Sequence, residues 1–313
     1  MIGRVFKSTG SFYSVKTEAG LINCRIKGKL RLAGIKSTNP VSVGDFVEIE
    51  LENEKEGLIL SIKDRKNYIV RKSVNLSKRT HIIASNIDQA VLIVTLISPK
   101  TFTQFIDRFL AAAEAYSIPL VLVFNKVDLY GEEELSDLLF LSQVYQDMDY
   151  EILHTSAEEK LGLEDFEKIL KDKTTLLSGH SGVGKSTLVN LVQSDLDLKT
   201  KPISDSHDQG QHTTTFAEMY ELDMGGYIVD SPGIKGFGTV NMKKEEIGDY
   251  FRDIFAFSAS CKFNNCMHVD EPQCAVKKAL EENQLSYTRY ESYLSMIKEI
   301  EEEGMYRSDN FNS

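Results

Sequence analysis

The sequence predicts a multidomain α/β protein with a small N-terminal β-barrel, a central domain of alternating strands and helices, and a mainly helical C-terminal domain. Three observations predict this organisation. Residues 1–72 divide into short alternating runs separated by glycines and by Asn39-Pro40. Residues 73–235 alternate β-branched apolar runs with segments of helical spacing. Residues 236–313 become helical around a cluster of cysteines and a histidine.

The first part is expected to form five short strands. They cover residues 5–8, 11–16, 21–27, 46–51 and 57–62, where the side chains alternate or are rich in β-formers. Five strands in a segment this short are typical of a barrel of the OB type, an architecture often used on RNA. The basic residues 63–79 are expected to form a linker out of the barrel.

The central part is expected to form a mainly parallel sheet covered by helices, because strands and helices alternate along it. Strands are expected at residues 88–97, 119–124, 151–154, 174–178, 214–222 and 227–230. Helices are expected at residues 102–116, 132–146, 163–171 and 185–193.

The overall composition is that of a globular protein. Of the 313 residues, 42% are hydrophobic and 27% are charged. No apolar run reaches the roughly 20 residues that a membrane helix needs, and no signal-peptide core follows Met1. We therefore expect a cytoplasmic protein that acts away from membranes.

The charge is distributed unevenly along the chain. Residues 1–80 contain 16 Lys and Arg against 8 Asp and Glu, a net charge of +8, although the whole chain carries −11. This asymmetry indicates that the N-terminal part faces nucleic acid. A basic surface that is merely solvated is the alternative interpretation.

A phosphate-binding loop stands between an expected strand and an expected helix. Residues 179–186 read G-H-S-G-V-G-K-S, a full match to the pattern in which glycines let backbone N–H groups converge on phosphate oxygens. Lys185 is expected to reach the β- and γ-phosphates and thereby to take part in catalysis, and the Ser186 hydroxyl is expected to bind Mg²⁺.

A guanine-recognition motif ends another strand. Residues 125–128 read N-K-V-D, in which the Asp128 carboxylate can accept hydrogen bonds from guanine N1–H and its exocyclic amine. Adenine offers no such pair of donors, so this carboxylate sets base specificity. Asn125 is expected to brace the loop, the Lys126 stem to lie over the base, and residues 155–157 to supply the accompanying guanine loop.

A third nucleotide-contacting element follows the phosphate loop. Asp230 ends a strand and can hold a Mg²⁺-bound water, and the N–H of Gly233 can meet the γ-phosphate. Upstream, residues 210–215 contain three threonines; Thr214 is favoured for Mg²⁺, with its two neighbours left open. The residues expected to contact the nucleotide are Asn125, Lys126, Asp128, Ser156, Ala157, Gly179, Ser181, Gly182, Val183, Gly184, Lys185, Ser186, Thr187, Thr214, Asp230 and Gly233.

The residue after Gly233 indicates slow intrinsic hydrolysis. It is Ile234, whose aliphatic side chain cannot orient a water molecule for attack. His212 is a candidate for that catalytic task, and a solvent-facing loop histidine is the alternative interpretation.

Three of the four cysteines and one histidine fall within 14 residues near the C-terminus. Three thiolates and one imidazole match a closed, tetrahedral structural zinc site. A cytosolic chain with clustered cysteines favours metal over disulfides. The expected zinc ligands are Cys261, Cys266, His268 and Cys274.

The order of these motifs is a circular permutation of a GTPase domain, because the guanine motif at residues 125–128 precedes the phosphate loop. Together with the basic N-terminal module, residues 210–215 and the zinc cluster, this order resembles the RsgA (YjeQ/YloQ) family of circularly permuted GTPases over nearly the whole chain. The resemblance implies a late assembly factor that binds the small ribosomal subunit and its rRNA, works as a monomer, and is stimulated by that subunit. It also places His212 where a catalytic role has been proposed.

Two other functions remain open from the sequence. One is an RNA-binding module whose nucleotide site acts only as a ligand-sensing lock, since the usual glutamine is missing at Ile234. The other is a P-loop ATPase, which the guanine-selective carboxylate of Asp128 disfavours.

Overall fold

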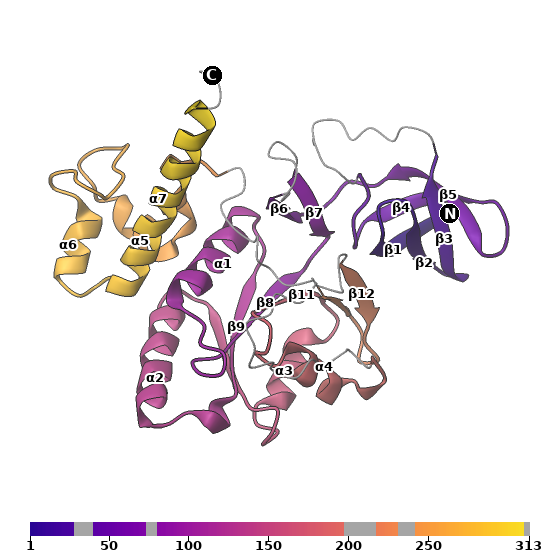
Figure 1. Ribbon diagram of the computed structural model, residues 1–313, viewed down its shortest axis with the longest axis horizontal. Coiled ribbons are helices and arrows are strands. Elements are labelled where there is room, and N and C mark those ends of the chain that lie inside the picture. Colours follow the sequence, from indigo (N-terminus) through magenta and orange to yellow (C-terminus); the bar gives the residue numbers. More distant parts are fainter. Residues whose placement is uncertain (28–39, 73–79, 197–216, 231–241, 310–313) are drawn as a thin grey trace.

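The computed structural model describes residues 1–27, 40–72, 80–196, 217–230 and 242–309 of the chain. A central sheet with its helices lies between the N-terminal barrel on one side and the C-terminal helices on the other (Figure 1). The expected mixed α/β architecture is confirmed. In the described residues, no helix has the length and apolar character needed to cross a membrane.

The N-terminal residues form a closed five-stranded barrel. Its strands are β1 (Ile2–Ser8), β2 (Tyr13–Thr17), β3 (Gly20–Ile26), β4 (Phe46–Leu51) and β5 (Glu56–Ile62). Strand β1 pairs with both β2 and β4, and β3 pairs in parallel with β5, so the sheet closes on itself. Alternate side chains fill the interior because successive residues of a strand face opposite sides. The expected strand bounds are within three residues of these.

The expected linker over residues 63–79 is wrong in part. Strand β6 (Tyr68–Lys72) lies within it and pairs antiparallel with β7 (Thr80–Ser85). The basic composition of this segment hid a strand whose apolar residues, Ile69 and Val70, are buried. Tertiary packing therefore overrides the local charge pattern.

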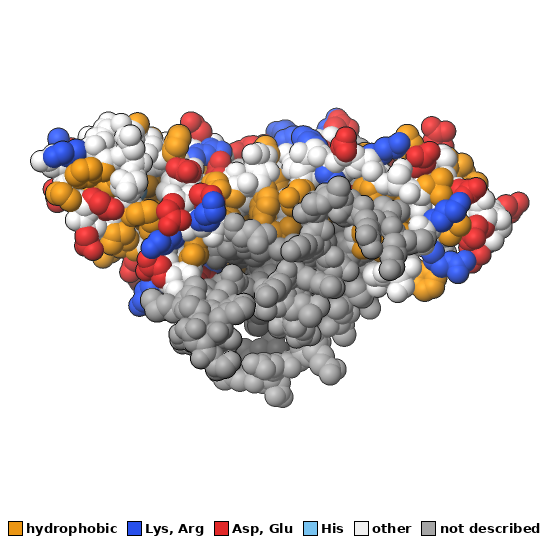
Figure 2. All heavy atoms as spheres, turned by 90° about the horizontal axis from the view of Figure 1, so that it is seen from above, with side chains coloured by type: hydrophobic (Ala, Val, Ile, Leu, Met, Phe, Trp, Pro, Cys, Tyr) orange, Lys and Arg blue, Asp and Glu red, His pale blue; other side chains and the backbone are white. Residues whose placement is uncertain are grey.

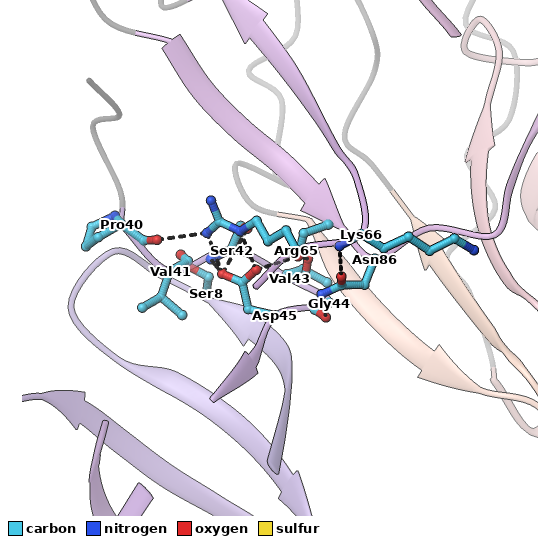
Figure 3. A network of polar contacts seen from close by, with 11 residues as sticks. Ser8, Pro40, Val41, Ser42, Val43, Gly44, Asp45, Arg65, Lys66 and Asn86 are labelled. Atoms are coloured by element: carbon cyan, nitrogen blue, oxygen red, sulfur yellow. Dashed lines mark hydrogen bonds and ion pairs between the residues drawn. The ribbon is translucent and has the colours of Figure 1, made fainter. Parts of the chain in front are cut away.

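A buried carboxylate joins the barrel to this hairpin (Figure 3). Asp45, fully buried, accepts two hydrogen bonds of 2.6 Å from the guanidinium of Arg65, which is only 7% exposed. Ser85 Oγ donates to the same carboxylate at 2.6 Å, and Asn86 Nδ2 donates to the Gly44 carbonyl at 3.0 Å. Residues from the barrel, the β5–β6 connection and β7 thus share one network.

The central sheet is mainly parallel, as expected. Its strands are β8 (Gln89–Val94), β9 (Leu120–Asn125), β10 (Glu151–Thr155), β11 (Thr174–Ser178), β12 (Glu218–Glu221) and β13 (Tyr227–Asp230). They lie in the order β10-β9-β8-β11-β13-β12, and only β12 runs antiparallel to its neighbour. Strands β8 and β9 are buried at every position, as central parallel strands are.

Helices cover both faces of this sheet. They are α1 (Thr103–Ala115), α2 (Glu132–Gln146), α3 (Leu163–Leu170) and α4 (Lys185–Val192), followed by the short 3₁₀ helix η2 (Ser194–Leu196). Alternate residues of β8 belong to the two cores: Leu92 packs in the cluster that includes α1 and α2, and Ile93 in the cluster that includes α3 and α4.

The barrel continues this sheet through the pairing of β1 with β12. Strand β1 pairs antiparallel with β12, with Lys7 opposite Glu218. Lys7 and Glu218 form an ion pair of 3.1 Å, and Lys16 and Glu221 one of 2.9 Å. Arg4, beside this contact, donates to Thr174 Oγ1 at 3.0 Å.

The C-terminal part is helical, as expected. It contains the 3₁₀ helix η3 (Lys244–Tyr250), α5 (Arg252–Ser258), α6 (Ala275–Glu281) and α7 (Tyr287–Asp309). Arg289 on α7 is fully buried and donates to Asp107 on α1 at 2.7 Å and to Asp253 on α5 at 3.0 Å. This ionic network anchors the C-terminal helices on the central domain. The domain limits after residues 72 and 235 stay predictions.

Candidate functional site

The phosphate loop connects β11 to α4 at the carboxyl edge of the parallel sheet. Gly179, Gly182 and Gly184 have φ values of 140°, 86° and 97°, in the region that L side chains rarely adopt. A Cβ at Gly179 would lie 2.2 Å from the carbonyl oxygen of Ile93, and one at Gly184 would lie 2.4 Å from Asn125 Nδ2. The backbone conformation therefore favours glycine at all three positions, and close neighbours require it at Gly179 and Gly184.

Lys185 folds back over the loop that precedes it. Its Nζ donates to the carbonyl oxygens of Gly179 and His180, both at 2.7 Å. Burial lowers the pKa of Lys185, and the nearby Asp230 carboxylate opposes this shift. Burial likewise raises the pKa of Asp230, against the effect of Lys185. The ammonium of Lys185 and the carboxylate of Asp230 thus influence each other electrostatically in a partly desolvated environment.

Asn125 connects the three nucleotide-facing loops. Its Nδ2 donates to the Val183 carbonyl in the phosphate loop at 2.8 Å, and its Oδ1 accepts from Thr155 Oγ1 at 2.9 Å. Asn125 is fully buried and ends β9, whereas Thr155 ends the adjacent strand β10. One side chain therefore sets the spacing between the guanine motif, the residue 155–157 loop and the phosphate loop.

Asp128 lies in the short 3₁₀ helix η1 (Val127–Leu129), next to Asn125. Its Oδ1 accepts a hydrogen bond from Ser156 Oγ, so the two guanine-facing loops are tied directly. The backbone of Lys126 has a left-handed conformation, with a φ of 62°. Its Nζ donates to the Ser98 carbonyl at 2.6 Å. The lysine stem thereby spans the edge of the site.

Two supporting residues escaped the sequence patterns. The Tyr130 hydroxyl donates to the Asn125 carbonyl at 2.8 Å and accepts from the Leu96 N–H at 3.0 Å, which holds the motif against β8. The Phe105 ring on α1 lies 3.9 Å from the His180 ring, centroid to centroid. Neither residue belongs to a spacing motif, because both act through contacts between elements distant in sequence.

The remaining expected nucleotide contacts divide into two groups. Ser181 and Thr187 are exposed, and Ser186 is half-buried at the start of α4, beside the loop. Ala157 follows Ser156 in the loop after β10 and is half-buried. His212, Thr214 and Gly233 lie outside the described residues, as do Ile234 and the neighbouring threonines.

The cysteine and histidine side chains expected to bind zinc come together. The ligand atoms of Cys261, Cys266, His268 and Cys274 all lie within 4.8 Å of one another. His268 Nδ1 is 3.6 Å from the sulfur of Cys261 and 3.4 Å from that of Cys274, and these two sulfurs are 4.0 Å apart. Tetrahedral zinc with bonds of about 2.3 Å to sulfur separates two sulfurs by about 3.8 Å. The donor set and its spacing therefore fit that metal.

Residues around this cluster hold its backbone in place. Tyr290 and Tyr293 on α7 donate their hydroxyls to the carbonyls of His268 and Met267, both at 2.6 Å. The Glu271 carboxylate accepts from the N–H groups of Met267 and Val269. His268, with a φ of 58°, sits in the left-handed region that these contacts stabilise. The cluster thus organises the packing between its own loop and α7.

Basic side chains of the barrel are interspersed with acidic ones. Figure 2 shows both signs over the barrel end of the visible face. Exposed ion pairs account for part of this mixing of charge. They join Arg25 to Glu52, Lys27 to Glu50 and Lys63 to Glu48. The described surface of the barrel therefore offers mixed charge, and the net positive charge of residues 1–80 does not form one basic face in this view.

Comparison with known families identifies the architecture. The model of the RsgA GTPase family matches residues 62–240, and that of the RsgA N-terminal domain matches residues 2–59. This chain belongs to the RsgA GTPase family. It is accordingly a GTP-hydrolysing enzyme with a circularly permuted GTPase domain, and the resemblance found in its motif order is confirmed.

Relatives within the RsgA family extend over the whole chain. A protein of Flavobacterium psychrophilum named small ribosomal subunit biogenesis GTPase RsgA is 55% identical, covering 100% of this chain and 96% of the relative. One of the same name from Christiangramia forsetii is 54% identical over 99% of each chain.

Two solved RsgA-type structures share the fold. The crystal structure of YjeQ from Thermotoga maritima has a TM-score of 0.76 at 35% identity, covering 96% of this chain and 98% of that one. YloQ, described as a circularly permuted GTPase, has a TM-score of 0.72 at 31% identity, covering 96% of this chain and 95% of that one.

Proposed function

We propose that this GTPase acts late in the maturation of the small ribosomal subunit, and that binding to the subunit and its rRNA stimulates hydrolysis of GTP. The observation that carries the proposal is the joining of guanine loop and phosphate loop by Asn125. It occurs in a chain that is 55% identical, over its full length, to a small-subunit biogenesis GTPase.

Guanine selection is assigned to the loops at the ends of β9 and β10. The Asp128 carboxylate is held by Ser156 Oγ and keeps its second oxygen for the base. A carboxylate that accepts from two guanine donors discriminates strongly, because adenine would leave it unpaired in a partly closed site. The backbone N–H of Ala157 is proposed to meet guanine O6, because the N–H of Ser156 donates to the Leu161 carbonyl at 3.1 Å.

Phosphate binding is assigned to the β11–α4 loop. The Lys185 ammonium donates hydrogen bonds to two loop carbonyls. The phosphate groups of the nucleotide are proposed to replace one of these acceptors. Its charge would then neutralise the β- and γ-phosphates, together with loop N–H groups from Ser181 to Thr187. Ser186, with Thr214, is proposed to bind the Mg²⁺ that neutralises phosphate charge in this class of enzyme.

Hydrolysis requires a group that orients the attacking water. Ile234 cannot do so, and His212 is proposed for that role, with Asp230 and Gly233 as the proposed switch residues. A monomer without the ribosomal subunit should therefore turn over GTP slowly. Cytoplasmic location, a monomeric state and the absence of a membrane partner complete the proposal.

Zinc is proposed for the cluster of Cys261, Cys266, His268 and Cys274. Four protein ligands close a tetrahedral site and leave no open position for a reacting water, so the metal would stabilise structure. The C-terminal helices that depend on it are proposed to contribute to the contact with the subunit.

The test is GTP turnover by the purified protein, alone and with isolated small ribosomal subunits, with Lys185→Ala as the blank. We expect stimulation by small subunits and none by large subunits. Equal turnover with and without small subunits would contradict the ribosomal part of the proposal. If stimulation occurs, His212→Ala should remove it while nucleotide affinity is retained; full stimulation of that variant would contradict the role of His212.

A further inference from the structure

Helix α2 carries large apolar side chains on both of its faces. Leu138, Leu141 and Tyr145 are buried against the domain. Around the rest of the helix, Leu135, Leu139 and Phe140 are 44%, 69% and 53% exposed. A helix that covers a sheet normally presents polar residues to solvent. The outer face of α2 therefore departs from the pattern expected of a helix that contacts only its own domain.

These three exposed side chains are hereafter called the α2 ridge (Leu135, Leu139 and Phe140). Leu135 and Leu139 are one turn apart and lie on the same side of the helix. Phe140 is about 100° further round, still within the exposed arc. Figure 1 shows α2 at the outer edge of the central domain, beside α1. Neighbouring large apolar groups at adjacent positions are characteristic of a contact surface, unlike scattered single residues.

The chain segment that contains the ridge carries charge of one sign. Residues 127–159 contain ten Asp and Glu and no Lys or Arg. Glu132, Glu133, Asp137 and Asp147, in and directly after α2, are exposed. RNA phosphates would be repelled by such a surface, and so would a second copy of the same face. A cationic protein segment with apolar side chains is complementary to it in both respects.

We propose that the α2 ridge binds a Lys- and Arg-rich protein segment whose apolar residues cover Leu135, Leu139 and Phe140. The inference rests on the proposed function, since it assigns this face to a basic protein of the small-subunit particle and assigns contacts with rRNA to other surfaces. The apolar side chains supply the affinity, and the acidic residues select the partner and speed association.

The α2 ridge lies close in the chain to the guanine loop of the nucleotide site. Helix α2 begins three residues after η1, which contains Asp128. Gly131, between them, accepts the first contact of the helix through its carbonyl, and its N–H donates to Glu134 at 3.0 Å. A segment on the ridge therefore lies next to the guanine loop, on the outside of the domain.

The experiment is site-specific photo-cross-linking of the full-length protein bound to small ribosomal subunits with a non-hydrolysable GTP analogue. Leu139 is replaced by p-benzoylphenylalanine, and the matched control carries the same group at Leu191, a 41% exposed leucine on α4. We expect a protease-sensitive adduct from position 139 that maps to a Lys- and Arg-rich protein segment, and no such adduct from position 191. An adduct with RNA or with a second copy would overturn the proposal, as would the same protein adduct from both positions.

Co-sedimentation with subunits in the same samples separates this inference from the proposed function. If the unmodified protein does not bind subunits, both fail. If binding is intact but no adduct forms at position 139, only the α2 ridge proposal fails. As a second measurement, the double variant Leu135→Ser with Leu139→Ser should bind subunits about tenfold more weakly, because two leucines that the partner segment covers are lost. Unchanged affinity, equal to that of Leu191→Ser, would overturn the proposal.

Discussion

At the scale of single residues, Asn125 links more than one loop of the site. It is buried, and both of its amide atoms are used, one toward Val183 and one toward Thr155. Sequence reasoning assigns it to brace a loop, but only the structure identifies the two partners. The physical reason is that Val183 and Thr155 are 58 and 30 residues away, and no local pattern encodes such contacts.

Replacement of this side chain should weaken both folding and nucleotide binding. Asn125→Ala leaves two buried polar groups without their partner, at a cost of about 1–3 kcal/mol each. We expect a lower urea midpoint and at least about tenfold weaker GTP binding. Asn23→Ala, at an exposed position of β3, is the matched control and should change neither quantity. A stability and affinity equal to those of the control would contradict the bracing role.

Base recognition is tested at Asp128. Asp128→Asn can keep a contact with Ser156 but replaces one acceptor by a donor, which opposes the guanine N1–H. Since hydrogen bonds to charged groups contribute about 1.5–3 kcal/mol, GTP affinity should fall by at least about tenfold. Xanthine nucleotides should bind better than GTP. Competition against a fluorescent guanine nucleotide measures both, and unchanged GTP affinity would show that another residue reads the base.

At the scale of elements, most strands and helices of the central domain are readable from the sequence. The expected bounds of β11, β13 and α2 agree with the structure, because apolar runs of strand length and helical spacing are local signals. The sequence pattern does not predict the β6–β7 hairpin, since its first strand lies in a basic segment that resembles a linker. Its pairing depends on packing beside the barrel, which the periodicity of one segment does not reveal.

The attachment of the barrel depends on the buried pair formed by Arg65 and Asp45. Removing one partner of a buried ion pair leaves an uncompensated charge and typically costs about 3–5 kcal/mol. Arg65→Ala should therefore lower stability strongly and raise hydrogen exchange in the barrel and in β7. The matched control is Arg25→Ala, which breaks an exposed pair with Glu52 and should have an effect below about 1 kcal/mol. Equal effects of the two variants, measured by urea unfolding, would contradict the prediction.

At the scale of the whole molecule, the three parts are joined by specific contacts. The barrel extends the central sheet through β1 and β12, and β12 forms a hairpin with β13, the strand that ends in Asp230. The C-terminal helices attach through Arg289 to Asp107. The barrel is thus paired with a strand next to the nucleotide site, and the helical part is anchored on α1.

Removal of the metal should affect the C-terminal part selectively. Structural zinc contributes about 10–16 kcal/mol to the folding of isolated zinc-finger peptides, so its loss should unfold the Cys261–Cys274 region and loosen α7. We expect one zinc per chain to be released by a strong chelator, with lower helix content by circular dichroism and retained GTP affinity. Unchanged helix content after complete zinc release would contradict a structural role, and Cys24→Ser, outside the cluster, should retain the metal.

The sequence by itself determined the family, the permuted motif order, the membership of the Cys3His cluster and most of the secondary structure. These depend on residue types at short spacings, which local chemistry constrains. Only the tertiary structure decided that Asn125 links three loops, that Asp45 and Arg65 secure the barrel, and that α2 exposes an apolar ridge. Each of these depends on which distant segments share a volume, and that is set by packing of the whole chain.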